Sequence, residues 1–377
     1  MINRLGKENV KKMLGSYPVV VLLGPRGSGK KTIANGFSKK CFNIENDDEV
    51  YRLDSLWEDQ IEKDELIVLN EISHSPELFL RIRGVLDEHR PRGGRFLITE
   101  SFESSMIKIL GSQVGILQLS PLLIQEIKPE EYEHLWFSGG YPHQWSDKAT
   151  FPEKQWEYLH QMIERYLPNL GFQLPPRETM RLFKMLVNFH GTIYNASRIG
   201  KNLGVSYHTV NKYVDFLIRS GLVRHLPAAQ IKSRKRLVKH PKLFWRDSGL
   251  LHALNGMKNN EDIFSQIWVG ASWEGWVIEQ VCTRLQMNGK SIQAYHFSTT
   301  DGYALDLLLN YEDQLWAINT TISSNPPPEF FSELAKVASM VGADNAILIS
   351  RTHQPLQQSG VVSLSLVEAL LLMLDKK

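Results

Sequence analysis

The fold of this chain is decided by the stretch VVVLLGPRGSGKKT, residues 19–32. Its five apolar residues, rich in valine, predict a buried strand, and the glycine-rich turn that follows leads into a helix. Gly24, Gly29 and Lys30 satisfy the spacing G-x-x-x-x-G-K, in which backbone N–H groups surround phosphates and the lysine reaches the terminal ones. Because a strand, this loop and a helix N-terminus follow in direct order, the stretch predicts a phosphate-binding loop (P-loop).

The P-loop supplies the candidate nucleotide-binding residues. The backbone of residues 27–29 is expected to cradle the phosphates, and Lys30 is expected to contact the β- and γ-phosphates. Thr32 is a candidate for a hydrogen bond on the phosphate side. The full predicted set is Gly24, Gly27, Ser28, Gly29, Lys30, Lys31 and Thr32.

Short apolar runs alternate with helical stretches from residue 19 to about residue 119. The strand-like runs are VVVLL, ELIVLN, RFLITE and GILQLS, and the helical ones are TIANGFSKK and PELFLRIRGVLDEH. This alternation predicts an α/β fold, a parallel sheet covered by helices. The chain then becomes helical from about residue 151 to residue 221, and a second α/β portion follows near Trp273. We expect three domains, at residues 1–145, 146–250 and 251–377.

Composition and cysteine content describe an ordinary globular protein. With 42% hydrophobic residues, 22% charged residues and a formal net charge of +2, overall charge indicates no partner. Cys41 and Cys282 lie far apart and without metal-ligand spacing, which argues against a disulfide framework and against a zinc site. The N-terminal stretch lacks the apolar core of a signal peptide, and the apolar tail LVEALLLMLD is too short to span a bilayer. These features predict a cytoplasmic protein that does not enter a membrane.

The order of several motifs resembles a prokaryotic family of AAA-type (AAA+) P-loop ATPases with a C-terminal domain of unknown function. The motifs are GPRGSGKKT, LIVLNEISHSPELF, GRFLITES, LQLSPLLIQE, FSGGYP, KRLVKHPKLFWRDSGLL and TTDGYALDLLL. The resemblance covers nearly the whole chain. It implies an ATPase core, a winged-helix segment and a C-terminal domain similar to restriction-endonuclease folds, with ATP as the nucleotide.

Three residues depart from the family's pattern at positions linked to the metal and the phosphates. Lys31 stands where a hydroxyl normally ligates Mg²⁺, and an ammonium offers no lone pair to a metal. Asn70 stands where an aspartate is expected at the end of the strand LIVLNE. Gln113 stands where the family has an arginine, which we interpret as a phosphate contact. Glu71 remains at the position of the family's catalytic carboxylate.

Each of the three departures is expected to weaken the metal-assisted stabilisation of charge on the transferred phosphoryl group. They predict an ATP-binding protein with weak or no hydrolysis, a pseudo-ATPase in which Glu71 orients any remaining attacking water. Lys31 is expected to supply positive charge in place of Mg²⁺, so that Mg²⁺ is dispensable and no residue is assigned to a metal. The alternative is that Mg²⁺ is held mainly by the nucleotide and waters, which leaves a slow ATPase.

The middle of the chain has the layout of a winged helix-turn-helix. NASRIGKNLG predicts a short helix closed by Gly204, and SYHTVNKYVDFLIRSG predicts a second helix with Ser206 as its N-cap. Basic residues dominate residues 198–246, against the single acid Asp215, which favours contact with DNA or RNA. They are Arg198, Lys201, Lys212, Arg219, Arg224, Lys232, Arg234, Lys235, Arg236, Lys239, Lys242 and Arg246. A non-enzymatic module that binds nucleic acid or protein, with the P-loop as scaffold, is the alternative function, and self-association is open.

The C-terminal portion shows the layout of a metal-dependent nuclease without its full set of charges. Glu274 and Asp306 stand where a helix acid and a strand aspartate are expected. Asn319 and Thr321 replace the glutamate and lysine of the next strand, and Ala304 replaces an acid common in the family. We therefore expect this domain to lack nuclease activity.

Overall fold

The computed structural model describes residues 2–89, 93–145, 150–231, 236–289 and 291–375. The chain forms two compact units. The first comprises residues 1–122 with two short segments, 141–143 and 219–221. The second comprises residues 123–140, 144–218 and 222–377. Each unit is described by itself.

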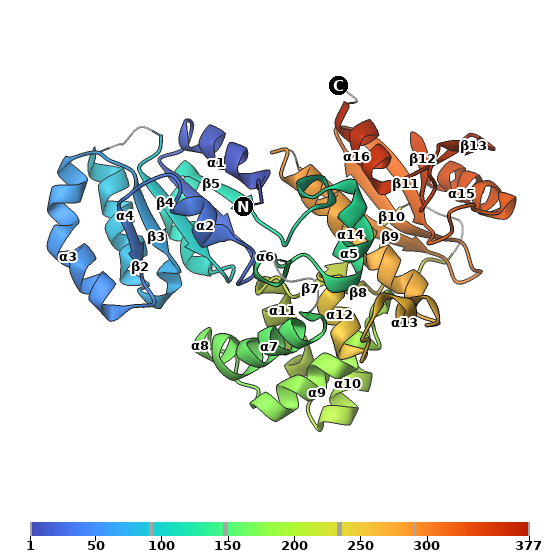
Figure 1. Ribbon diagram of the computed structural model, residues 1–377, viewed down its shortest axis with the longest axis horizontal. Helices are drawn as coiled ribbons and strands as arrows, with labels where there is room; N and C mark the ends of the chain where they lie inside the picture. Colours follow the sequence, from blue (N-terminus) through green and yellow to red (C-terminus); the bar gives the residue numbers. More distant parts are fainter. Residues whose placement is uncertain (1, 90–92, 146–149, 232–235, 290, 376–377) are drawn as a thin grey trace. The chain divides into compact units, whose positions relative to one another are not determined.

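The first unit is built on a five-stranded parallel sheet in the order β2-β3-β4-β1-β5 (Figure 1). Its strands are β1 Val19–Leu23, β2 Cys41–Asn43, β3 Ile67–Asn70, β4 Phe96–Glu100 and β5 Val114–Gln118. Its helices are α1 Gly6–Leu14, α2 Lys30–Ala34, α3 Asp47–Glu62 and α4 Glu77–His89. The α/β fold with a parallel P-loop sheet is therefore confirmed.

Burial on both faces explains why these strands read as continuous apolar runs. Every residue of β1, β3 and β4 is buried. One face of the sheet, including Val21, Leu69 and Ile98, packs against Trp57 of α3 and Phe79 of α4. Since alternate residues of a strand point to opposite faces, the remaining buried residues face the other side. The carboxyl ends of β1, β3 and β4 meet at one edge, which is where the P-loop begins.

The middle part of the second unit contains helices and a small antiparallel sheet. Its order is α9 Pro176–Val187, β6 Thr192–Ile193, α10 Ala196–Leu203, α11 Tyr207–Arg219, β7 Val223–Leu226 and β8 Lys242–Trp245. The three strands lie in the order β6-β8-β7. Further helices are α5 Tyr132–Ser138, α7 Glu153–Gln161, α8 Leu167–Asn169, α12 Ser248–Leu254 and α13 Asn260–Phe264. Helix α6 Pro142–Trp145 begins in the first unit and ends in the second.

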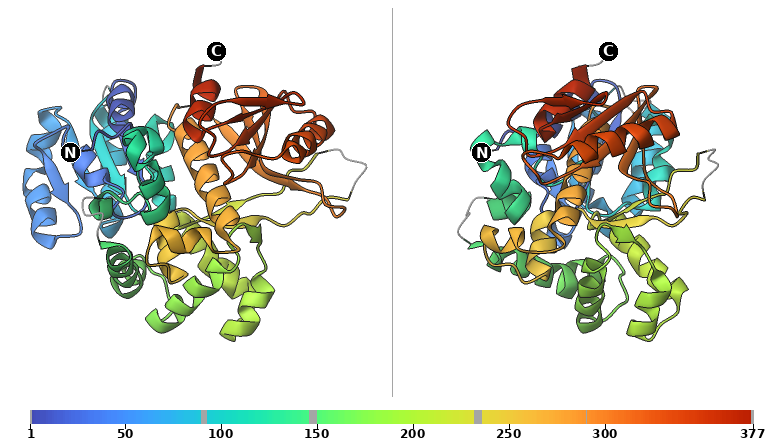
Figure 2. Two further views of the ribbon diagram at one scale, coloured as in Figure 1. Left: turned by 45° about the vertical axis from the view of Figure 1, so that its right-hand side comes forward. Right: turned by 90° about the vertical axis from the view of Figure 1, so that its right-hand side faces the viewer.

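The C-terminal part holds a mixed six-stranded sheet in the order β13-β14-β12-β11-β10-β9. Its elements are α14 Val269–Gln286, β9 Ile292–Ser298, β10 Ala304–Tyr311, β11 Gln314–Thr320, α15 Pro328–Val341, β12 Asn345–Ile349, β13 Leu356–Gln358, β14 Val361–Leu364 and α16 Leu366–Asp375. Strands β9, β10 and β11 form an antiparallel meander, and β12 pairs with β11 in parallel. Helix α15 packs on one face through Leu334 and Val337 (Figure 2).

Two local predictions, at Gly204 and Ser206, are confirmed in these helices. Gly204 closes α10 in the left-handed conformation, at φ 72°. The Ser206 hydroxyl accepts a hydrogen bond from the Thr209 N–H, as an N-cap does. Before α16, the Glu368 carboxylate accepts from the Ser365 N–H while the Ser365 hydroxyl accepts from the Glu368 N–H, which is a capping box.

Candidate nucleotide-binding site

The P-loop turns between β1 and α2 in a path that requires glycine at two positions. A Cβ atom on Gly24 would lie 2.0 Å from the Leu119 carbonyl oxygen, so no larger residue fits there. Gly29 has φ 93° and forms the N-cap of α2, a conformation that L side chains avoid. The Ser28 N–H donates to the Pro25 carbonyl oxygen at 3.2 Å. The glycine pattern read from the sequence thus follows from the backbone geometry of the loop.

Lys30 is the centre of the site. Its ammonium is buried, with the side chain 4% exposed, and donates to the carbonyl oxygens of Gly24 at 2.8 Å and Pro25 at 3.1 Å. A third hydrogen bond runs to the Ser101 hydroxyl at 3.0 Å, and the Glu71 carboxylate lies 3.8 Å away. Burial lowers the pKa of Lys30, and the charge of Glu71 opposes that shift. All three donors of the ammonium are used by the loop and by the end of β4.

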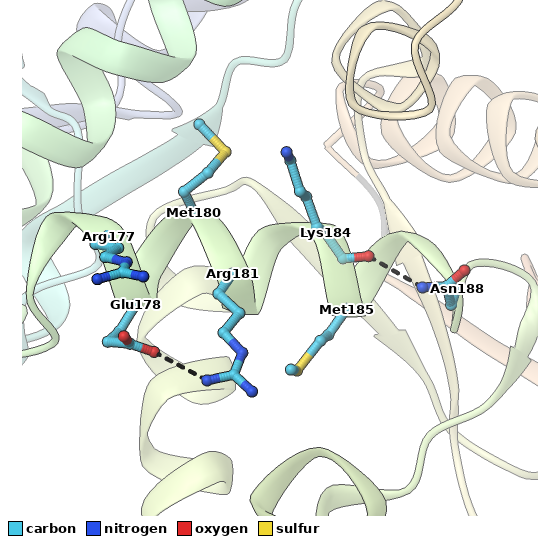
Figure 3. Close-up of a pocket in the computed structure, with 7 residues that line it drawn as sticks. All are labelled: Arg177, Glu178, Met180, Arg181, Lys184, Met185 and Asn188. Atoms are coloured by element: carbon cyan, nitrogen blue, oxygen red, sulfur yellow. Dashed lines mark hydrogen bonds and ion pairs between the residues drawn. The ribbon is translucent and has the colours of Figure 1, made fainter. Parts of the chain in front are cut away.

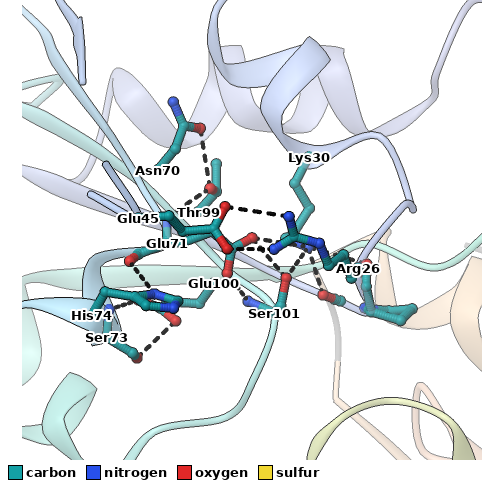
Figure 4. Close-up of polar contacts among 12 residues, drawn as sticks. Arg26, Lys30, Glu45, Asn70, Glu71, Ser73, His74, Thr99, Glu100 and Ser101 are labelled. Carbon is teal, nitrogen blue, oxygen red and sulfur yellow. Dashed lines mark hydrogen bonds and ion pairs between the residues drawn. The ribbon is translucent and has the colours of Figure 1, made fainter. Parts of the chain in front are cut away.

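Two glutamates and two serines connect the ends of β3 and β4 in a crossed arrangement (Figure 4). The carboxylate of Glu71, just after β3, accepts from the Ser101 N–H at 3.0 Å and from its hydroxyl at 2.6 Å. The carboxylate of Glu100, at the end of β4, accepts from the Ser73 N–H at 2.7 Å and from its hydroxyl at 2.8 Å. Glu71 has a positive φ of 57°, which is uncommon for a residue with a side chain and is a feature of functional sites.

Glu100 is a site residue that the sequence analysis did not single out. It is 1% exposed, and burial together with the charge of Glu71 raises its pKa to about 8. A buried acid at the carboxyl end of a parallel strand, close to a P-loop lysine, is a functional-site candidate. The signal in the sequence is the acid that ends the otherwise apolar run FLITE.

Replacing Glu100 by glutamine is expected to stabilise the protein at alkaline pH. The pKa of Glu100 is about 8 in the folded chain, above the unfolded value of 4.5, so its ionisation removes stability as pH rises from about 4.5 through 8. Glutamine carries no such cost and can still bond to Ser73. We expect a gain of roughly 1–3 kcal/mol at pH 9 and little change at pH 5, measured by denaturant unfolding. Equal stability of both proteins at both pH values would contradict this prediction.

The amide of Asn70 is fully used by its neighbours. Its nitrogen donates to Asn35 at 3.1 Å, and its oxygen accepts from the Thr99 hydroxyl at 3.1 Å. Asn70 is 1% exposed and connects β3 to the end of α2 and to β4. Lys31 and Thr32, in the first turn of α2, are exposed. Burial raises the pKa of Cys41, although the charges of Arg52 and Lys31 oppose that rise. Burial would also raise the pKa of Glu45, but nearby positive charges, chiefly Arg26 and to a smaller extent Lys31, lower it.

Gln113 lies far from the P-loop of its own chain. Our interpretation of its position as a phosphate contact in this site is therefore wrong. Val114, the next residue, begins β5 and pairs with Val19 at the start of β1. The P-loop leaves the opposite end of β1, five residues later. At about 3.3 Å per residue, roughly 16 Å of strand separates the two ends.

Two residues that lie outside the loop sequence also contact the P-loop, and the sequence of the loop does not predict these contacts. The guanidinium of Arg4 is buried and donates to the Ser28 carbonyl oxygen and, at 2.8 Å, to that of Ser120. His143 lies against Gly27, where an added Cβ would be 3.0 Å from the imidazole Cε1. Residues 141–143 and Arg4 thus border the loop.

The basic stretch of residues 198–246 is partly neutralised by two acids of α14. Arg224 and Arg246 both donate to the Glu279 carboxylate, at 2.9 Å and 2.8 Å. Lys242 bonds to Glu274 at 2.7 Å. Three of the twelve basic residues are thereby unavailable to a nucleic acid. Lys232, Arg234 and Lys235 lie outside the described residues, whereas Arg198, Lys201, Lys212, Arg219, Arg236 and Lys239 are exposed.

The nuclease-like residues of the C-terminal part do come together. Asp306 lies at an irregularity of β10, and its carboxylate accepts from the Thr320 N–H at 2.8 Å. Burial raises the pKa of Glu274 to about 8, and the charge of Asp306 adds to that rise. The Asn319 side-chain oxygen accepts from the Asp306 N–H at 3.0 Å. Glu274, Asp306 and Asn319 each have a hydrogen-bond partner within the protein, which fits a structural role.

Both cysteines are free. Within the described ranges, no group of three or more His, Cys, Asp or Glu side chains could hold a metal ion. None of the described helices is both long enough and apolar enough to cross a bilayer.

Comparison with protein families follows the same division along the chain. Residues 16–128 match the model of an AAA domain. The chain carries an AAA-type P-loop domain. Residues 129–261 and 269–368 match two domains of unknown function, DUF8612 and DUF4143. The AAA domain is thus followed by a C-terminal domain of unknown function, as the resemblance implied.

Comparison with individual proteins gives two similar sequences and several solved structures. Two uncharacterized proteins, of Mycobacterium tuberculosis and Mycobacterium bovis, are each 29% identical over 328 residues, covering 84% of this chain and 73% of the relative. A Walker-type ATPase of Pyrococcus abyssi is 13% identical, with a TM-score of 0.46 over 68% of this chain and 96% of that one. A signal transduction ATPase with a tetratricopeptide repeat sensor, from Pyrococcus horikoshii, is 15% identical, with a TM-score of 0.29 over 76% and 47%.

Proposed function

We propose that the AAA domain binds ATP and hydrolyses it weakly or not at all. The observation that carries this proposal is the contrast between Lys30 and Asn70. Lys30 lies in an intact P-loop, with glycines at both positions that the backbone requires. Asn70 has its amide committed to Asn35 and Thr99, so the end of β3 offers no carboxylate at the position where Mg²⁺ expects one.

In this proposal the phosphates of ATP replace protein acceptors around Lys30. The ammonium exchanges its bonds to the Gly24 and Pro25 carbonyl oxygens for charge-assisted bonds to phosphate, which are stronger. Lys31 adds a second positive charge at the start of α2. The remaining hydroxyl in that turn, on Thr32, is the candidate for a hydrogen bond on the phosphate side. Glu71 orients any water that still reacts.

Restoring the two missing metal ligands tests this proposal. The double variant Lys31→Thr, Asn70→Asp supplies a hydroxyl and a carboxylate, and the amide of Asn35 can turn to donate to the new carboxylate. We expect Mg²⁺-dependent ATP hydrolysis at least about 10-fold faster than that of the wild type, measured as phosphate release, because metal ligation stabilises charge in the transition state. The same variant with Lys30→Met is the inactive control. A wild type that already hydrolyses ATP as fast as the double variant would contradict the proposal.

We further propose that residues 176–245 form a winged helix-turn-helix. The order of α9, β6, α10, α11, β7 and β8, with the sheet order β6-β8-β7, supports this assignment. Contact with nucleic acid through this module is the alternative function, and Arg198, Lys201 and Lys212 remain exposed for it. We also propose the three domains 1–145, 146–250 and 251–377, the last a nuclease-like α/β domain without nuclease activity.

A further inference from the structure

The outward face of α9 lines a groove in the second unit (Figure 3). The groove has a volume of about 480 Å³ and is lined by Arg177, Glu178, Met180, Arg181, Lys184, Met185 and Asn188. The opposite face of the helix is buried, through Leu182, Phe183 and Leu186 among others. The helix is therefore held in place by its apolar face while it presents the groove-lining side chains outward.

The groove is predominantly positive. Three cations face a single acid, Glu178, which lies 3.6 Å from the Arg181 guanidinium. Arg181 also donates to the Asn202 carbonyl oxygen at 2.6 Å, which ties α9 to the end of α10. Across the part of the chain that the structure describes, the side chains of Arg177 and Lys184 have no hydrogen bond or ion pair. Two long cations are thus available to a ligand.

The end of α10 adds positive charge beside the groove. Lys201 precedes Asn202, the residue that Arg181 contacts, and it is exposed. Arg198, one turn earlier on α10, is exposed as well. By contrast, Arg224, Lys242 and Arg246 on the neighbouring strands are ion-paired with α14. Among the described residues, exposed cations therefore lie on α9, α10 and α11, and also at Arg236 and Lys239 between β7 and β8.

The spacing of the cations indicates the kind of ligand. Arg177, Arg181 and Lys184 follow one another along the helix instead of converging on one point. Residues 177 and 184 are about 10 Å apart along the axis, at 1.5 Å per residue. Phosphates repeat along a nucleic-acid strand, so a row of cations of this length can contact more than one of them. A single small anion would contact only one or two of these side chains.

The floor of the groove argues against a peptide ligand. Helix recognition in a groove requires apolar pockets, and strand addition requires an open sheet edge. Here the half-buried side chains of Met180 and Met185 lie between charged ones, so the groove offers no apolar pocket. Its lining residues belong to α9, apart from Asn188 directly after the helix, so it offers no sheet edge either. In helix-turn-helix proteins the helix that precedes the recognition helix crosses the nucleic-acid backbone, and α10 holds that place before α11 in the winged helix-turn-helix proposed above. We propose that the α9 groove, with the end of α10, binds the phosphate backbone of a nucleic acid. This inference rests on the proposed winged helix-turn-helix and does not depend on nucleotide binding by the AAA domain.

The test is a binding titration of the full chain with fluorescently labelled oligonucleotides of about 20 nucleotides, single-stranded and duplex, at several salt concentrations between about 50 and 200 mM. The double variant Arg177→Ala, Lys184→Ala removes two cations that bond to nothing described, and alanine suits a helix. We expect at least a 10-fold loss of affinity. We also expect the slope of log K against log salt to fall in magnitude by about 1.8 for duplex or about 1.4 for single strands.

The control Lys11→Ala, Lys12→Ala removes the same charge from exposed positions of α1 and should leave both quantities unchanged. Unaltered affinity and salt slope in the α9 variant would overturn the inference, as would a wild type that binds no oligonucleotide at the lowest salt. Polyglutamate that competes as well as the oligonucleotide would also overturn it, in favour of an acidic protein. ATP titration of the α9 variant keeps the two proposals apart, because ATP binding should be unchanged.

Discussion

Replacing Glu279 by glutamine is expected to lower the free energy of unfolding by about 3–5 kcal/mol, because it breaks a buried salt bridge. Glu279 is 5% exposed in the middle of α14 and accepts hydrogen bonds from both Arg224 and Arg246. Burial alone would raise its pKa, but the two guanidinium groups lower the pKa to about 2. Glutamine leaves both guanidinium groups buried without a counter-charge.

Thermal unfolding measures this effect, and we expect the transition of the variant to fall by about 10 °C. The pH dependence has a defined sign. The pKa of Glu279 is about 2 in the folded chain and 4.5 when unfolded, so its contribution is complete above about pH 4.5 and is lost as pH falls towards 2. The variant should therefore converge with the wild type at acidic pH. Glu333→Gln, at an exposed position of α15, is the matched control. Equal losses in both variants would contradict the buried-pair account.

Replacing Lys30 by methionine is expected to weaken ATP binding by roughly 100-fold or more, since one ammonium that bridges two phosphates makes hydrogen bonds worth about 1.5–3 kcal/mol each. Methionine fills a similar volume in this buried position. Burial lowers the pKa of Lys30, which means that the charged ammonium is costly to bury. Because the substitution removes this cost, the free protein should remain folded.

Calorimetric titration with ATP measures the loss for Lys30→Met, and thermal unfolding of the free variant checks its fold. Lys39→Ala removes an exposed lysine from the same unit and should bind ATP as the wild type does. If Lys30→Met binds ATP with unchanged affinity, the nucleotide site lies elsewhere.

The sequence predicted those parts of the fold that are set by local patterns. The run VVVLL, the glycines of the P-loop and the strand IVLN are each recognisable over a few residues, and each lies where it was expected. Strand β2 and helix α3 were not predicted. The three residues of β2 are too few to show a period, and its place at the sheet edge depends on pairing with β3.

The sequence predicted only those residues of the site that lie close together along the chain, as in the P-loop. The crossed pairs Glu71–Ser101 and Glu100–Ser73 exist because β3 and β4 are neighbours in the sheet, which a single sequence does not specify. Arg4 reaches the P-loop from the N-terminus for the same reason.

The basic stretch shows the limit of counting charges along a chain. Asp215 is its only acid in sequence, yet Glu274 and Glu279 of α14 neutralise three of its cations in space. The positive groove of α9 lies outside that stretch and was not predicted.

The central claim is that the AAA domain binds ATP without relying on a metal. The most direct measurement is a calorimetric titration of ATP into the wild-type protein, in Mg²⁺ and in excess chelator side by side. We predict similar affinity in both conditions, with the charge of Lys31 acting in place of the metal. Binding that appears only with Mg²⁺, or no binding in either condition, would contradict the claim.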